Sequence, residues 1–178
     1  MTLSRHCGKN LRWQTPDSER FVGNTAGGVA SNDSTYMTGE DYGGGVYVGP
    51  NNSSDGATIN GYVTPTMNTH VCYSGGFSGA ICGNYITAVG GYEDGIGPGF
   101  WTEQVHRTAP AGEGDSGGPV LAGSIGSGLN GIGVITLGDP DTFTTCQAIG
   151  DRLCSWRVFN VNLQSVLSSN GLDLITVP

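Results

Sequence analysis

Short runs of apolar or alternating residues, separated by glycine-rich turns, make up most of the chain. These runs are rich in Val, Ile, Thr and Tyr, and clusters such as Gly49-Pro50-Asn51-Asn52 separate them. Both features are typical of β-strands joined by tight turns. The clearest predicted strands are Gly45–Val48, Thr58–Val63, Tyr85–Val89, Val120–Ala122 and Ile132–Leu137.

A helical pattern occurs only near the C-terminus. Three apolar residues there have the i, i+3, i+4 spacing of one helix face: Leu163, Val166 and Leu167. Gly171 is placed to end this helix, and Leu172–Val177 is expected to form a last strand. The pattern as a whole predicts an all-β protein with one C-terminal helix, arranged as a barrel or a sandwich.

The length and net charge of the chain limit the classes of protein to which it can belong. A chain of 178 residues has the usual size of one domain. Its net charge is −8 and it has only seven Lys and Arg residues, so nucleic acid is not an expected partner. No apolar run is long enough for a membrane helix. Low charge with much Ser, Thr, Asn and Gly suggests an extracellular protein, whose export signal would lie upstream of this chain.

Five cysteines form two close pairs and one single residue. Cys72 and Cys82 are one pair, Cys146 and Cys154 the other, and neither has the C-x-x-C spacing of a zinc site. We therefore expect two local disulfides and no metal site. Cys7 remains, either as a free thiol or as half of a disulfide whose partner lies outside this chain.

The segment Gly112–Val120, GEGDSGGPV, is the strongest candidate for chemistry. Its glycines allow positive φ and close approach of a substrate carbonyl, so the N–H groups of Gly114 and Ser116 could point at one oxygen. A serine in such a segment becomes a nucleophile when a base accepts its proton and a third group orients the base. The alternative is an ordinary glycine-rich turn.

The segment also matches the G-x-S-x-G elbow of α/β-hydrolases, but two features exclude that interpretation. An elbow serine is followed by a helix, whereas Gly117-Gly118-Pro119 follows Ser116. The elbow also requires a histidine after the serine. All three histidines, His6, His70 and His106, precede Ser116, so the order must be His-Asp-Ser or Asp-His-Ser.

Several segments together resemble chymotrypsin-fold serine peptidases, in particular the streptogrisin-like bacterial branch. GDSGGPV resembles the serine motif of this family, and Leu3–Gly8 (LSRHCG) resembles the motif around its catalytic histidine. Gly39–Gly43 (GEDYG) resembles the stretch that carries the catalytic aspartate. The Cys72–Cys82 segment resembles a short disulfide loop, and Val158–Thr176 resembles the last strand and helix.

The resemblance implies a catalytic triad of His6, Asp41 and Ser116. Ser116 would attack the scissile carbonyl, His6 would transfer the proton, and Asp41 would orient His6. Asp33 and Asp55 are alternatives for the acid, although both lie in segments with turn composition.

The resemblance also implies where substrate binds. The N–H groups of Gly114 and Ser116 would bind the oxyanion. Thr136-Leu137-Gly138 would line the substrate channel, along which a peptide adds as an extra strand. The family's cysteine just before the serine motif is absent here and Pro110 stands where trypsin-like enzymes keep an aspartate, so the specificity of relatives does not transfer.

The expected fold is a single trypsin-like peptidase domain over residues 1–178, with two six-stranded antiparallel barrels and a C-terminal helix. Residues 1–66 would form the rest of the first barrel, which would lack its opening strands and leave the chain N-terminally truncated. Residues 67–178 would form the second barrel and the helix. The site would lie between the barrels.

The expected function is that of a secreted serine endopeptidase, a monomer that acts on polypeptides without a cofactor. The alternative is an inactive or incomplete homologue that binds peptides or glycans.

Overall fold

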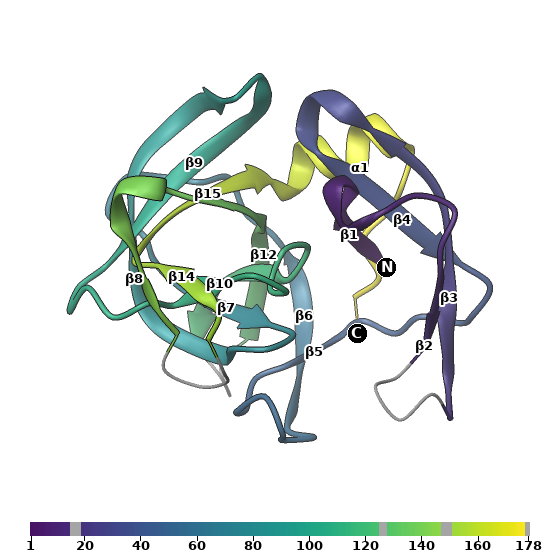
Figure 1. Ribbon diagram of the computed structural model, residues 1–178. Helices are drawn as coiled ribbons and strands as arrows, with labels where there is room; N and C mark the ends of the chain where they lie inside the picture. Colours follow the sequence, from purple (N-terminus) through teal and green to yellow (C-terminus); the bar gives the residue numbers. More distant parts are fainter. Residues whose placement is uncertain (15–18, 125–127, 147–150, 177–178) are drawn as a thin grey trace.

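The strands expected from the sequence are present, several of them longer than the apolar runs that predicted them (Figure 1). The computed structural model describes residues 1–14, 19–124, 128–146 and 151–176. Its strands are β1 (Thr2–Ser4), β2 (Arg12–Gln14), β3 (Phe21–Val29), β4 (Ser34–Thr38), β5 (Gly45–Tyr47), β6 (Gly56–Tyr62), β7 (His70–Gly75), β8 (Gly79–Glu93), β9 (Ile96–Gln104), β10 (Ala111–Gly112), β11 (Pro119–Ser124), β12 (Gly128–Gly138), β13 (Phe143–Thr145), β14 (Leu153–Ser155) and β15 (Arg157–Asn162). The helices are three short 3₁₀ turns, η1 (Arg5–Cys7), η2 (Ala30–Asn32) and η3 (Pro140–Thr142), and the α-helix α1 (Leu163–Asn170).

Six strands close into a barrel. Their order is β11-β7-β8-β9-β15-β12, and β11 pairs with β12 to complete the ring. A closed barrel leaves no free edge within the ring. Two further strands, β6 and β5, extend this sheet from β12, while β10, β14 and β13 form a small separate sheet.

The first sheet is open. It has the order β1-β4-β3-β2, so β1 and β2 lie at its two edges, and Figure 1 shows it beside the closed barrel, with β2 and β3 on the side away from that barrel. The molecule thus combines one closed barrel with a half-barrel sheet and the C-terminal helix, as the expected double-barrel fold requires. Strands β5 and β6, which precede the expected boundary near residue 66, join the sheet of the closed barrel through β12.

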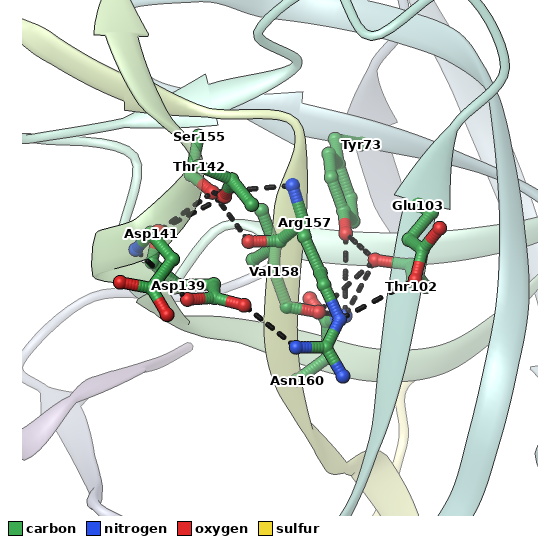
Figure 2. A network of polar contacts seen from close by, with 10 residues as sticks. All are labelled: Tyr73, Thr102, Glu103, Asp139, Asp141, Thr142, Ser155, Arg157, Val158 and Asn160. Carbon is green, nitrogen blue, oxygen red and sulfur yellow. Dashed lines mark hydrogen bonds and ion pairs between the residues drawn. The ribbon is translucent and has the colours of Figure 1, made fainter.

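The interior of the closed barrel is largely apolar, and among its described residues Tyr73, Thr102 and Asn160 form a buried polar group. Val71 and Tyr73 alternate inward along β7 and are fully buried. Figure 2 shows the Tyr73 hydroxyl beside Thr102 and Asn160, and the Asn160 amide donates to both hydroxyls at 3.2 and 3.1 Å. Buried hydroxyls of this kind need such partners. Burial raises the pKa of Tyr73 to about 12, so its hydroxyl stays protonated as a donor.

The predicted helix is confirmed, and the predicted last strand is wrong. Helix α1 ends at Gly171, which adopts φ +63°, a conformation that glycine favours. Within the described residues after Gly171 no strand is present. Leu172 and Leu174 pack against the buried apolar clusters instead, which uses their side chains without strand pairing.

Both predicted disulfides are confirmed. Cys72 is bonded to Cys82 and Cys146 to Cys154, while Cys7 is a free thiol. Among the described helices, none is long and apolar enough to cross a membrane.

Candidate active site

Strand register brings His6 and Asp33 together. In the antiparallel pair of β1 and β4, Ser4 lies opposite Ser34. The residues that follow β1 therefore lie beside the residue that precedes β4. His6 is in the turn η1 just after β1, and Asp33 comes just before β4, so the two side chains meet at the same end of the sheet.

Three hydrogen bonds join the two turns. The N–H of Arg5 donates to the Asp33 carbonyl oxygen at 2.7 Å, and the N–H of His6 donates to Asp33 Oδ1 at 2.9 Å. His6 Nδ1 lies 2.5 Å from Asp33 Oδ2. The carboxylate thus holds both the backbone and the ring of His6, and its bond to Nδ1 leaves Nε2 free to act on a substrate.

The acid beside His6 is Asp33 and not Asp41. Asp41 is exposed and lies beyond the far end of β4, three residues after Thr38. Asp33 is only 8% exposed, which strengthens its interaction with the ring. The expectation for Asp41 rested on its local sequence, which does not contain the register of β1 against β4.

The environment of His6 favours its protonated form. The hydrogen bond to Asp33 raises the pKa of His6 to about 10, and the neighbouring Cys7 side chain adds a smaller effect in the same direction. The His6 side chain is 44% exposed, so water reaches the ring.

Ser116 lies in the turn between β10 and β11, on the closed barrel. The N–H of Gly117 donates to the Ile135 carbonyl at 2.9 Å, and the N–H of Gly118 donates to the Asp115 carbonyl at 2.9 Å. These bonds fix the backbone on both sides of the serine. The Ser116 hydroxyl itself donates to the Thr136 carbonyl at 3.5 Å, a long bond that leaves it free to turn.

Two N–H groups of this turn have no acceptor. Among the described residues, neither the N–H of Gly114 nor that of Ser116 donates to a protein oxygen, although the N–H groups of Asp115, Gly117 and Gly118 all do. Gly114 adopts φ +84°, which glycine permits readily. The pair of free donors beside a serine hydroxyl is the arrangement that stabilises an oxyanion.

The shape of the turn depends on the buried carboxylate of Asp115, a role that the sequence did not suggest. Asp115 is 1% exposed. Its oxygens accept from the N–H groups of Phe77 and Ser78 and from the N–H of Gly112, each at 2.9 Å, and the Arg152 guanidinium lies 3.2 Å away. A buried charge with this many donors is compensated, and it anchors the turn that carries Ser116.

The two halves of the site are in contact. The Ser4 hydroxyl on β1 donates to the Ile135 carbonyl on β12 at 3.0 Å, and the Cys7 thiol lies 3.7 Å from the Ser116 carbonyl oxygen. Gly117 lies so close to β1 that an added Cβ would be 2.7 Å from the Ser4 nitrogen. The structure thus brings the histidine turn of the open sheet against the serine turn of the closed barrel.

Helix α1 holds the turn that carries Asp33. The Asn32 amide donates to the Ser169 hydroxyl at 2.7 Å and to the Ser165 carbonyl at 3.3 Å. On the other side of Asp33, the Ser34 hydroxyl receives a hydrogen bond from the Asn170 amide at 2.7 Å. Both neighbours of Asp33 are therefore bonded to the C-terminal helix.

The segment Thr136–Gly138 presents a free strand edge next to Ser116. On one side Leu137 and Gly138 pair with β15. On the other side no described strand pairs with them. The free edge begins at the residue whose carbonyl oxygen accepts from Ser116, so an extended chain bound along it would pass the serine.

The other two histidines lie elsewhere. The His70 ring packs edge-on against Tyr85 at 5.0 Å between centroids, and His106 is exposed near the end of β9. The described residues contain no group of His, Cys, Asp and Glu side chains suited to a metal ion.

Neither the protein-family models nor the curated proteins give a match to this sequence. Several solved structures, in contrast, are similar to this chain. The chain is similar to Cellulomonas bogoriensis chymotrypsin with a TM-score of 0.69 and 24% identity, over 99% of this chain and 85% of that one. It is similar to Thermobifida fusca protease A with a TM-score of 0.68 and 26% identity, over 99% and 84%.

Nocardiopsis protease gives a TM-score of 0.64 and 22% identity, over 99% of this chain and 85% of that chain. All three are bacterial enzymes of the same architecture. The chain therefore has the chymotrypsin fold, and the solved structures that it resembles are bacterial serine proteases.

Proposed function

We propose that the chain is a serine endopeptidase whose triad is His6, Asp33 and Ser116. One observation carries this proposal: a histidine held by a buried carboxylate lies against a serine turn that has two free N–H donors. Asp41, first expected as the acid, has no part in this triad because Asp33 occupies the position beside His6. The comparisons support the same class of activity, since the similar structures are serine proteases.

In the first half of the reaction, the Ser116 hydroxyl turns from Thr136 to His6. As Oγ bonds to the scissile carbonyl carbon, its proton passes to His6 Nε2. Asp33 keeps the Nδ1 proton in place and stabilises the imidazolium that forms. The carbonyl oxygen becomes an oxyanion, which the N–H groups of Gly114 and Ser116 bind.

The intermediate then loses its leaving group. The C–N bond breaks, and the Nε2 proton of His6 passes to the departing amine, which leaves an acyl group on Ser116. In the second half the oxygen of a water molecule bonds to the acyl carbon while one water proton passes to His6 Nε2. When this second tetrahedral intermediate breaks down, the C–Oγ bond breaks, the acid is released and the His6 proton passes to Ser116 Oγ, so the enzyme is regenerated without a cofactor.

The substrate is a polypeptide in extended form. Its main chain would pair with the free edge of Thr136–Gly138, in the manner of an added β-strand. Such pairing supplies affinity through backbone hydrogen bonds that every sequence can make. We expect the protein to act as a monomer, because one chain supplies all the residues named here.

We place the protein outside the cell. The two local disulfides persist in oxidising compartments, and low charge with high Ser, Thr and Gly content fits the same location. The short Cys72–Cys82 loop is the feature that favours the streptogrisin-like branch among bacterial enzymes.

A fluorophosphonate probe tests the proposal. The probe should label the protein, and Ser116→Ala should abolish labelling because the probe reacts only with an activated serine. Ser168→Ala, a change at an exposed serine of α1, is the matched control and should label like the parent. Intact-mass spectrometry measures the adduct.

Labelling that persists in Ser116→Ala contradicts the assignment of the nucleophile. A folded parent that takes no label and does not hydrolyse casein would favour the alternative function, a homologue that only binds peptides or glycans.

A further inference from the structure

The peptide bond between Glu113 and Gly114 carries one of the two free N–H groups beside Ser116. In a trans peptide the carbonyl oxygen and the N–H point in opposite directions. This bond is trans, since the one cis peptide among the described residues is that between Gly97 and Pro98. Whatever fixes the Glu113 carbonyl therefore also fixes the direction of the Gly114 N–H.

The Arg152 side chain holds that carbonyl. Its Nε donates to the Glu113 carbonyl oxygen at 2.6 Å, and its Nη2 donates to the same oxygen. Hydrogen bonds from a charged guanidinium are stronger than neutral ones, and its rigid planar fork restricts the direction of the acceptor. The Gly114 N–H is thereby turned away from the guanidinium, and among the described residues it has no protein acceptor there.

Arg152 is itself held in place by two further groups. Its Nη2 lies 3.2 Å from Oδ2 of the buried Asp115 carboxylate, and its guanidinium carbon lies 4.8 Å from the centre of the Phe77 ring. The side chain is only 14% exposed, so these charge and cation–π contacts are little weakened by water. The guanidinium thus has a defined position beside the turn that carries Ser116.

The backbone at Gly114 needs such a restraint. A Cβ added to Gly114 would lie 2.5 Å from the Phe77 ring, so the close packing here requires glycine. Glycine also leaves the backbone free to adopt many conformations, and a second glycine, Gly112, precedes Glu113. Local sequence alone therefore does not hold the peptide between Glu113 and Gly114 in one orientation.

On the basis of the proposed function, we infer that Arg152 is a positioning residue for the oxyanion site. By holding the Glu113 carbonyl, it keeps the Gly114 N–H directed at the substrate oxygen, although Arg152 touches no reacting atom. Without Arg152 this peptide is free to rotate. Rotation removes one of the two donors and turns a carbonyl oxygen toward the developing negative charge, which it repels.

Arg152→Ala tests this inference with a peptide p-nitroanilide substrate. Its kcat should fall by about 10²-fold with little change in KM, because an oxyanion donor acts on the transition state and its loss has an effect of that order. A peptide boronic acid forms a tetrahedral adduct with Ser116, so its affinity should fall by a similar factor. The matching peptide carboxylate should bind as it does to the parent.

The pH profile separates this role from a general disturbance of the site. The limb of kcat/KM that belongs to His6 should stay where it is in the parent, since the hydrogen bond between His6 and Asp33 is not altered.

Two further variants complete the experiment. Arg152→Lys keeps a positive charge beside Asp115 but replaces the planar fork with a single nitrogen, so it should keep the parent's stability and recover only part of kcat. If Arg152→Ala does not fold, this variant supplies the test. Arg107→Ala is the matched control, because Arg107 also stacks on an aromatic ring, 4.9 Å from the centre of Trp156, and should leave kcat and KM unchanged.

A parent-like kcat in Arg152→Ala, full recovery of kcat in Arg152→Lys, or a loss confined to KM overturns the inference while the peptidase function stands. No hydrolysis by the parent together with no fluorophosphonate label on Ser116 overturns both.

Discussion

At the scale of single residues, the interaction of His6 with Asp33 decides how the proposed site responds to pH. A general base must be neutral before it can accept a proton, so only unprotonated His6 is active. Asp33 raises the pKa of His6 to about 10, and the site gains its basic form as pH rises toward that value. The same carboxylate that makes His6 a strong base therefore moves the pH range of its activity upward.

We predict that kcat/KM of the parent rises with pH along a limb near the raised pKa of His6. In Asp33→Asn the hydrogen bond to a charged carboxylate is lost, so the limb should move down toward the ordinary histidine pKa of about 6.5. The plateau should fall by about 10⁴-fold, because an amide no longer enforces the correct tautomer. Hydrolysis rates measured from pH 5 to 11 give both quantities.

Asp41→Asn is the control for this experiment. Asp41 is exposed and makes no described contact with His6, so its profile should overlay that of the parent. A large loss in Asp41→Asn with none in Asp33→Asn would reverse the assignment of the acid.

At the scale of elements, helix α1 acts on a turn that precedes it by more than a hundred residues. The Asn32 amide donates to the Ser169 hydroxyl and the Asn170 amide donates to the Ser34 hydroxyl, so both neighbours of Asp33 are bonded to the helix. Asp33 itself has φ +44°, which is uncommon for an aspartate and is maintained by its surroundings. The helix thus positions the acid without touching it.

We predict that Asn32→Ala lowers both stability and activity. Asn32 is 3% exposed, and its loss leaves buried hydrogen-bonding groups without partners, which costs about 1–3 kcal/mol of unfolding free energy. Displacement of Asp33 should reduce kcat/KM by up to about 10²-fold and move the His6 limb to lower pH. Urea unfolding and the pH profile measure the two effects.

Ser168→Ala on the same helix should change neither quantity, since Ser168 is exposed and, among the described residues, its hydroxyl donates to the Ser165 carbonyl of α1 itself. If Asn32→Ala loses stability but keeps the parent pH limb, the helix has a structural role only.

The elements also show what the sequence could and could not predict. Cysteine spacing predicted both disulfides, and the i, i+3, i+4 pattern predicted α1, because these are local properties. The acid beside His6 depends on the register of β1 against β4, and the anchoring of Asp115 depends on Phe77 and Ser78, far from it in the chain. Neither the β1–β4 register nor the contact of Asp115 with Phe77 and Ser78 can be recognised in a short stretch of the sequence.

At the scale of the whole molecule, the proposed site joins two units of different construction. Ser116 belongs to a closed barrel, whereas His6 and Asp33 belong to an open sheet with two edge strands. Closed rings of hydrogen bonds resist local opening better than sheets with free edges. The strand pattern predicted only a barrel or a sandwich, and it was the family resemblance that implied two barrels, the first without its opening strands.

We predict that the first sheet exchanges its amide hydrogens faster than the barrel. Peptides that cover β2, β3 and β4 should lose protection before peptides that cover β7, β9 and β15, because the sheet β1-β4-β3-β2 ends at β1 and β2. Hydrogen exchange with mass spectrometry under native conditions measures this difference. Equal protection of the two units would show that they open as one.

The contacts of α1 also determine at which stage of synthesis the turn that carries Asp33 can be held in place. During synthesis His6 and Asp33 emerge first and Ser116 later. Residues 165–170, which bond to the Asp33 turn, emerge after Ser116. A growing chain therefore carries all three groups of the proposed triad before it has the helix that sets its acid in place. The proposed site would therefore take its full form only after α1 has emerged.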